Sequence, residues 1–267
     1  MGEMMSFPAG DNARERILAL RIELEKLFYE RDELISIDCE NIKMEYMLLF
    51  GGLEYKLYEA YCDYLRLRRK KEMIQAKKNR EEPIDLEEIE AALDEEFRAY
   101  KERLQAKMEE VTSAIDRSEG EWLSEEDTVR LKRRYRRIMK RLHPDLNPSV
   151  TREERELFYR AVESYKNCDL ATIEMILAMI EGRAPDDLPT DPAAMEEEIA
   201  RLEALVKSVR EEIRTIKEKP PYTWKIYVED EKKRAAKLRD LRAELWSYKD
   251  GIRTQEESIA ELLREQP

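Results

Sequence analysis

Apolar and polar positions alternate along most of the chain with the three- and four-residue spacing of amphipathic helices. Short β-branched or aromatic runs between turn residues, which would predict strands, are almost absent. Only 7 residues are glycine and 41% are charged, a composition that favours long helices with polar outer faces. We therefore predict an all-α, elongated fold with a helical N-terminal region, a central helical hairpin and a C-terminal coiled-coil hairpin.

The N-terminal region, 13–117, is predicted to form a helical bundle or coiled-coil arm after a disordered leader at 1–12. The apolar pattern falters near 36–41, which favours a break between two helices there. Beyond this point the pattern continues without a slip across two adjacent glycines, Gly51 and Gly52.

We therefore expect one helix from about Asn41 to Asn79, with a kink at the glycines as the alternative. Each glycine costs roughly 1 kcal/mol relative to alanine but would admit the close approach of another helix. A third helix is expected to start at Pro83, with an inward stripe that includes Met108 and Ile115.

The C-terminal region, 193–267, follows a proline-containing linker at 183–192. It carries two heptad-patterned helices separated by Pro220-Pro221, with Asp191 expected to cap the first. Two such helices joined by a tight turn predict an antiparallel hairpin. An intermolecular coiled coil, which would make a homodimer, is the alternative.

The central segment, 118–182, contains a helix that starts at Ser124 and ends before Pro144. Thr151 and Glu154 form a capping-box pattern that starts a second helix. The apolar faces of the two helices are expected to pack together antiparallel. The predicted core comprises Leu131, Tyr135, Ile138, Leu142, Phe158, Ala161, Val162 and Tyr165.

The formal net charge is −12, which argues against a general nucleic-acid binder. Between Arg130 and Arg141, however, there are eight basic residues and no acid. The helix dipole favours bases near a helix C-terminus but does not exclude acids. Nucleic-acid binding through this helix remains a second hypothesis, although its one aromatic, Tyr135, belongs to the buried stripe and could not stack on a base.

The remaining chemistry of the sequence predicts neither an enzyme nor a metal site. Cys39, Cys62 and Cys168 lack the spacing of a zinc site or a disulfide framework, which favours a reducing, cytoplasmic location. No apolar run is long enough to cross a bilayer. His143 is the only histidine and has no neighbouring ligand cluster or nucleophile, so we expect no cofactor.

His143-Pro144-Asp145 and its two flanking helices resemble the J-domain of DnaJ-type co-chaperones. That family has an aromatic residue eight positions before its histidine, an aliphatic one five before and an apolar one immediately before; these are Tyr135, Ile138 and Leu142 here. The second helix of the family carries a phenylalanine and, seven residues on, a tyrosine after a small residue. Phe158, Ser164 and Tyr165 match that pattern. The resemblance spans about a quarter of the chain, from Ser124 to Ile180.

The resemblance implies docking on an ATP-bound DnaK-type chaperone and stimulation of its ATP hydrolysis. His143, Pro144 and Asp145 would be the trigger motif, and the helical arms are expected to recruit an unknown client or to place the J-domain. The basic docking face would consist of Arg136, Arg137, Arg141, Lys140 and Lys132.

The chain departs from the family in three respects. It lacks a Gly/Phe-rich linker and a CxxCxGxG zinc region, and the usual first helix is not recognisable before Ser124. We expect the end of the helix at 84–117, or Trp122-Leu123, to cover the side of the core where that helix would lie. A coiled-coil scaffold with a vestigial J-domain is the alternative to an active co-chaperone.

Overall fold

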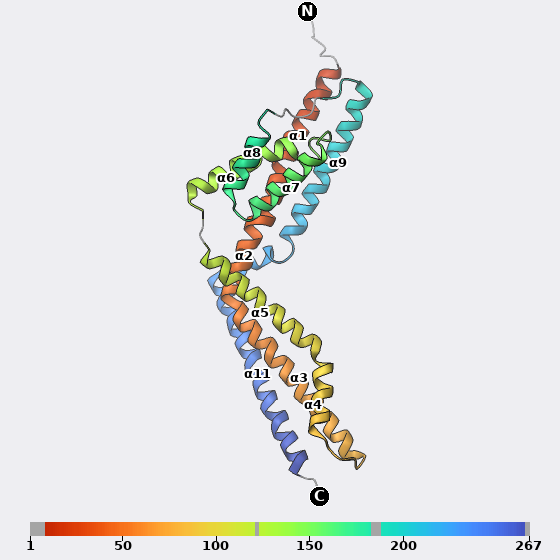
Figure 1. Ribbon diagram of the computed structural model, residues 1–267, viewed down its shortest axis with the longest axis vertical. Helices are drawn as coiled ribbons and strands as arrows, with labels where there is room; N and C mark the ends of the chain where they lie inside the picture. The colour runs from red at the N-terminus through yellow and green to blue at the C-terminus, as the bar shows by residue number, and fades with distance from the viewer. Residues whose placement is uncertain (1–8, 121–122, 183–187, 265–267) are drawn as a thin grey trace, which may run out of the picture. The chain divides into compact units, whose positions relative to one another are not determined.

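The computed structural model describes residues 9–120, 123–182 and 188–264, with side chains from Asn12 onward. Within these ranges the secondary structure is helical and contains no strand, so the predicted all-α class is confirmed (Figure 1). The predicted leader and linker fall largely on 1–8 and 183–187, which lie outside the described residues. Helix α1 already begins at Ala9, so residues 9–12 of the predicted leader are helical.

The chain folds into two compact units, each assembled from distant segments of the sequence. The first unit contains residues 9–41 and 123–223, and the second contains 42–120 and 224–264. None of the described helices combines the length and the apolar character needed to cross a membrane.

Residues 9–79 are helical without interruption. Their elements are α1 (Ala9–Glu33), the π-helical turn η1 (Leu34–Asp38), α2 (Cys39–Tyr46), a second π-helical turn η2 (Met47–Gly51) and α3 (Gly52–Asn79). The predicted break near 36–41 is wrong because a π-helical turn inserts a residue and shifts the apolar phase without ending the helix. The prediction that the helix continues through Gly51-Gly52 is confirmed.

In the second unit, Asp85 caps α4 (Leu86–Glu96) by accepting hydrogen bonds from two backbone N–H groups of its first turn. The predicted start at Pro83 is therefore too early. The helix also breaks at Phe97, and α5 (Arg98–Glu119) follows. The prediction that Met108 and Ile115 point inward is wrong: both are exposed, and the buried position is Ala114, one residue before Ile115.

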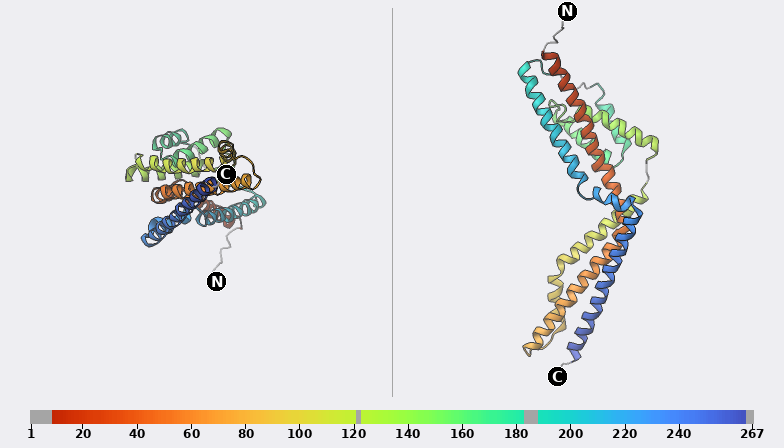
Figure 2. Two further views of the ribbon diagram at one scale, coloured as in Figure 1. Left: turned by 90° about the horizontal axis from the view of Figure 1, so that it is seen from below. Right: turned by 180° about the vertical axis from the view of Figure 1, so that it is seen from behind.

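The C-terminal helices do not form the predicted antiparallel hairpin. Helix α9 (Pro192–Lys217), capped by Asp191 as predicted, packs along α1. Beyond the η3 turn (Tyr222–Trp224) and α10 (Lys225–Glu229), α11 (Glu231–Arg264) packs along α3. Figure 2 shows α1 (red) beside α9 (cyan), and α3 (orange) beside α11 (blue).

Ion pairs explain the choice of partner for α9. The pairs are Arg16–Glu203, Glu23–Arg210 and Glu30–Lys217, each separated by 187 residues in sequence, so α1 and α9 run parallel. The apolar seams of long helices resemble one another, whereas flanking charges discriminate between partners. An antiparallel hairpin would have brought other charges together.

The central segment folds as α6 (Glu125–Leu142), α7 (Arg152–Lys166) and α8 (Leu170–Met179). These helices share one hydrophobic core with α1 and α9. We expected 84–117 or Trp122-Leu123 to complete this core; α1 and α9 supply most of the additional residues. Leu123 packs at the edge of this core, Trp122 lies outside the described residues, and α5 belongs to the second unit.

Candidate functional site

Helices α6 and α7 form an antiparallel pair whose starts and inner faces follow from the local sequence. Ser124 caps α6, and Thr151 with Glu154 forms the complete capping box of α7. The rings of Tyr135 and Tyr165 stack with centroids 4.1 Å apart. The structure buries Leu131, Tyr135, Ile138, Leu142, Phe158, Ala161 and Tyr165, and half-buries Val162.

The loop between α6 and α7 begins with His143 and Pro144, and Asn147 stabilises it from within. The side chain of Asn147 is buried and donates a hydrogen bond of 2.9 Å to the Lys140 carbonyl at the end of α6. Its backbone N–H donates to the His143 carbonyl over 2.9 Å. Asn147 therefore satisfies carbonyls that the end of a helix leaves without partners. Sequence reasoning missed it, although an asparagine just beyond a helix end is a common capping signal.

His143 is buried, with 4% of its surface exposed. Its imidazole stacks on the ring of Phe28 from α1, with centroids 3.8 Å apart, and meets Phe158 edge-on at 5.1 Å. Burial, with the nearby Arg31 guanidinium, lowers the pKa of His143 to about 3. The side chain is thus neutral near pH 7, and its Nδ1 accepts a hydrogen bond of 3.2 Å from the Asp145 backbone N–H.

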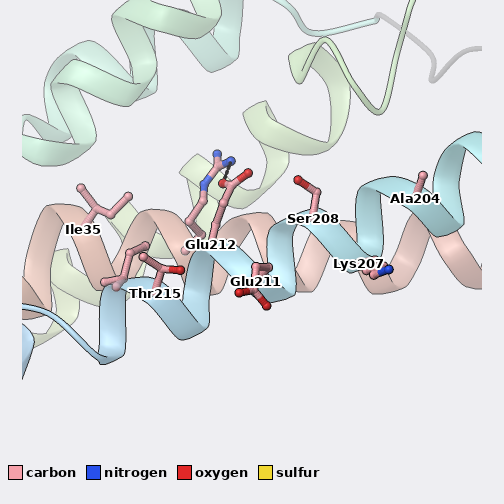
Figure 3. A pocket seen from close by; sticks show the side chains of 9 residues that line it. Ile35, Ala204, Lys207, Ser208, Glu211, Glu212 and Thr215 are labelled. Atoms are coloured by element: carbon pink, nitrogen blue, oxygen red, sulfur yellow. Dashed lines mark hydrogen bonds and ion pairs between the residues drawn. The ribbon is translucent and has the colours of Figure 1, made fainter.

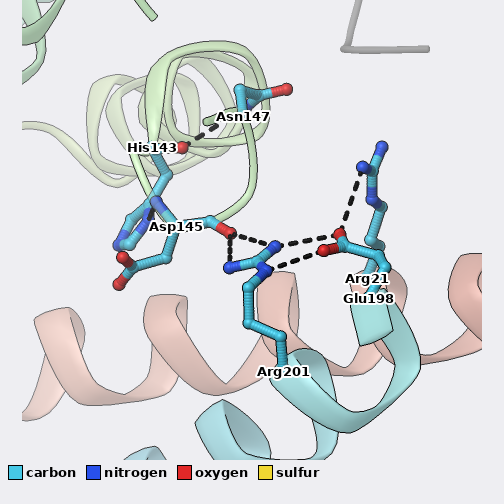
Figure 4. Close-up of polar contacts among 6 residues, drawn as sticks. All are labelled: Arg21, His143, Asp145, Asn147, Glu198 and Arg201. Atoms are coloured by element: carbon cyan, nitrogen blue, oxygen red, sulfur yellow. Dashed lines mark hydrogen bonds and ion pairs between the residues drawn. The ribbon is translucent and has the colours of Figure 1, made fainter. Parts of the chain in front are cut away.

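Asp145 is exposed at the tip of the loop, whereas Pro144 is half-buried. The Asp145 N–H is bound by His143, and its carbonyl oxygen accepts two hydrogen bonds from the Arg201 guanidinium of α9 (Figure 4). The carboxylate is therefore presented to solvent from a backbone that is held on both sides.

Helix α1 runs antiparallel to α6 and contacts one side of its basic face. Three contacts line up along the two helices: Lys140 Nζ with Glu25 Oε2 at 3.5 Å, the Arg136 guanidinium 3.6 Å from the Tyr29 ring centroid, and Lys132 with Glu33. The four-residue spacing on both helices repeats the contact once per turn. We call this set of contacts the α1–α6 ladder.

The opposite side of α6 faces α8. Arg130 and Arg134 both pair with Glu174, at 2.8 and 3.1 Å, and Arg141 donates to the Ile180 carbonyl at 3.2 Å. Between the two sides lie Arg133 and Arg137, which are exposed. Within the described part of the chain, neither guanidinium makes a hydrogen bond or an ion pair.

Of the five residues predicted to form the docking face, only Arg137 is thus left without an intramolecular partner among the described residues. Lys132, Arg136 and Lys140 contact α1, and Arg141 contacts α8. Arg133, which was not among the five, shares the outward row with Arg137. The sequence could not show this division because the acids of α1 and α8 that face α6 are distant in the chain.

A buried polar contact fixes α1 against α6 behind the ladder. The Tyr135 hydroxyl donates a hydrogen bond of 2.6 Å to Asp32 Oδ2, and the Asp32 carboxylate also accepts from Arg31. Burial beside the Asp32 carboxylate raises the pKa of Tyr135, so its hydroxyl stays protonated. Because this polar atom pairs across two helices, it favours one register of α1 on α6.

A groove of about 660 Å³ lies between α1 and α9, with Ser208 and Thr215 as its hydroxyl residues (Figure 3). No histidine or cysteine lines it; its ionisable lining residues are Arg31, Lys207, Glu211 and Glu212. Within the described residues, no group of three or more His, Cys, Asp or Glu side chains is placed to hold a metal ion. The loop at His143–Asp145 therefore remains the strongest candidate site.

Comparisons with protein-family models, with curated proteins and with solved structures found no match for this chain.

Proposed function

We propose that this chain is a J-domain-like co-chaperone that docks on a DnaK-type chaperone and stimulates its ATP hydrolysis. The observation that carries the proposal is the exposed Asp145 carboxylate at the tip of the α6–α7 hairpin, with both of its backbone polar groups held. An exposed, fixed carboxylate can reach a cation or a hydrogen-bond donor on a partner without first being ordered.

The exposed cations of α6 suggest how the partner is oriented. Arg133 and Arg137 point outward from α6 toward solvent, and Lys140 keeps more than half of its side chain exposed (56%). A negatively charged surface on the chaperone would be attracted to this row over a Debye length of about 8 Å at physiological salt. We therefore assign docking to Arg133, Arg137 and Lys140, and the trigger contact to Asp145.

The resemblance implies that His143 belongs to the trigger motif, whereas in this proposal it supports the loop from inside. Because its ring is enclosed by Phe28 and Phe158, it cannot touch a partner unless α1 moves. We propose that it acts by accepting the Asp145 N–H and thereby orienting the loop.

A scaffold function is the second candidate, and one observation favours it. The α1–α6 ladder already occupies Lys132, Arg136 and Lys140, three residues of the expected docking face. If docking needs these cations free, the J-like segment would serve only as a structural part of the first unit. Nucleic-acid binding is supported less well, since Tyr135 is buried and most of the basic residues of α6 already contact α1 or α8.

An ATPase assay with a DnaK-type chaperone at low salt tests the proposal. Full-length protein should increase hydrolysis, and Asp145→Asn should abolish the increase because it removes the charge while keeping the backbone contacts. Glu153→Gln is the matched control, since it removes an exposed carboxylate from the first turn of α7. The absence of stimulation over a wide range of chaperone concentrations would favour the scaffold function.

A further inference from the structure

Arg201 reaches the loop from α9, 56 residues away in sequence. Its Nη1 and Nη2 atoms donate hydrogen bonds of 3.1 and 3.2 Å to one acceptor, the carbonyl oxygen of Asp145 (Figure 4). A guanidinium that places two donors on a single oxygen restrains both the position and the direction of that carbonyl.

The backbone hydrogen bonds within the loop use carbonyls other than that of Asp145. The His143 carbonyl accepts the N–H groups of Leu146 and Asn147, and the Asn147 carbonyl accepts that of Val150. The donors to the Asp145 carbonyl come instead from Arg201, and the Asp145 N–H is bound to His143. The two peptide groups that flank the Asp145 Cα are thus held by different residues, which limits rotation about φ and ψ.

Glu198 orients the Arg201 guanidinium toward the loop. Glu198, one turn earlier on α9, accepts from Arg201 Nε at 2.7 Å and from Nη2 at 2.9 Å. The Glu198 side chain is only 13% exposed, and it also pairs with Arg21 of α1 at 3.5 Å. The hydrogen bonds from Arg201 hold the pKa of Glu198 below its ordinary value, so this carboxylate stays charged near neutral pH.

Attachment of α9 to the fold does not require this contact. Arg210 and Lys217 of the same helix pair with Glu23 and Glu30 of α1, and the apolar seam of α9 is buried in the shared core. In the described part of the chain, Arg201 is the basic residue of α9 whose side chain reaches the α6–α7 loop. Its contact therefore serves the loop rather than the attachment of the helix.

We infer that Arg201 is a positioning residue for the trigger loop, which it aims by holding the Asp145 carbonyl while the carboxylate stays exposed. The inference rests on the proposed function. It makes the site composite: the hairpin supplies Asp145, and α9, from outside the segment that resembles a J-domain, fixes its direction.

The test compares full-length Arg201→Ala with Arg210→Ala, an arginine of α9 that pairs with α1 but does not contact the loop. Two quantities of the chaperone ATPase are measured: the maximal stimulation and the concentration that gives half of it. We expect Arg201→Ala to lower the maximal stimulation about tenfold and to leave the half-saturating concentration unchanged, because the docking cations are intact. Arg201→Lys should fall between wild type and Arg201→Ala, since lysine keeps the charge beside Glu198 but lacks the fork.

A second readout does not depend on the chaperone. The ¹³C resonance of the Asp145 carbonyl should shift in Arg201→Ala and stay in place in Arg210→Ala. If wild-type protein stimulates the chaperone and Arg201→Ala stimulates it equally, the positioning role is overturned while the proposed function stands. An unshifted carbonyl resonance in Arg201→Ala would also overturn it. If wild-type protein does not stimulate, the proposed function fails, and a shifted resonance would then report only a structural contact.

Discussion

The imidazole of His143 lies in a stack with the Phe28 ring, with centroids 3.8 Å apart and planes inclined by 21°. This contact joins the loop of the α6–α7 hairpin to a helix more than a hundred residues earlier in the chain. It removes the only histidine from solvent and keeps it neutral. Its first consequence is for the pH dependence of stability.

The first prediction concerns pH. The folded-state pKa of His143 is about 3, below the ordinary value of 6.5 that applies when the chain is unfolded. Below pH 6.5 the unfolded state therefore binds a proton that the folded state does not, and stability decreases by about 1.4 kcal/mol for each pH unit down to about pH 3. Denaturant unfolding at several pH values measures this slope.

His143→Phe is the control, because it keeps an aromatic ring between Phe28 and Phe158 but cannot titrate. The variant should lose about 1.4 kcal/mol per pH unit of the dependence between pH 6 and 4. An NMR titration adds a direct check, since the single histidine gives one C2–H resonance. Movement of that resonance between pH 5 and 7.5 would contradict the burial of His143.

The second prediction concerns docking. Arg133→Glu and Arg137→Glu should each raise the half-saturating chaperone concentration about tenfold at low salt, because both free cations face the partner in the proposed function. The effect should shrink at high salt, where exposed charges are screened. Arg155→Glu, an equal charge change on the exposed surface of α7, is the control. Equal effects of all three variants would mean that net charge alone matters.

The third prediction tests the buried hydroxyl of Tyr135. Tyr135→Phe removes the 2.6 Å hydrogen bond to Asp32 and leaves a buried carboxylate with one fewer donor. We expect a loss of about 1–3 kcal/mol in the free energy of unfolding. Tyr159→Phe, at an exposed position of α7, should change it by less than about 0.5 kcal/mol. Similar losses in the two variants would argue against the contact.

The fourth prediction compares the adjacent glycines of the long helical segment. A Cβ atom at Gly51 would lie 2.7 Å from Val111 Cγ2, whereas one at Gly52 meets no atom within 4 Å. Gly52→Ala should stabilise the second unit by up to about 1 kcal/mol, because alanine is the better helix former. Gly51→Ala gains the same propensity but must displace Val111, at about 1–3 kcal/mol.

Gly51→Ala should therefore be net destabilising by about 1 kcal/mol in thermal or denaturant unfolding. Combining it with Val111→Ala should restore part of the helix-propensity gain, since the smaller side chain makes room for the new methyl group. Gly51→Ala as stable as Gly52→Ala would show that α5 does not approach Gly51 closely.

Helix type and helix ends could largely be predicted from the sequence, because they depend on neighbouring residues. Ser124, Thr151 and Asp191 cap the helices that their motifs indicate, and the backbone stays helical through Gly51-Gly52, although Gly51 ends the π-helical turn η2. The errors near 36–41 and at Phe97 arise where the backbone leaves the regular α-helical repeat. A π-helical turn and a non-helical residue each change the phase of the apolar stripe. Periodicity alone therefore predicted a helix end near 36–41 and missed the break at Phe97.

The candidate site could be predicted only in part. The stripe of α6 and the capping box of α7 follow from local spacing, which places His143 and Asp145 in the bend between the two helices. Which side chains enclose that bend depends on contacts between distant segments. Phe28 and Arg201 lie 115 residues before His143 and 56 residues after Asp145, respectively.

The sequence by itself therefore determined the helices, their caps and the loop that carries Asp145. The tertiary structure decided which helix pairs with which, that His143 is enclosed and neutral, and that α1 contacts three of the eight basic residues between Arg130 and Arg141. The physical reason is that helix formation depends on residues within one or two turns, whereas apolar seams are interchangeable between partners. Only the parallel register of α1 and α9, with its three ion pairs, brings Arg201 to the loop.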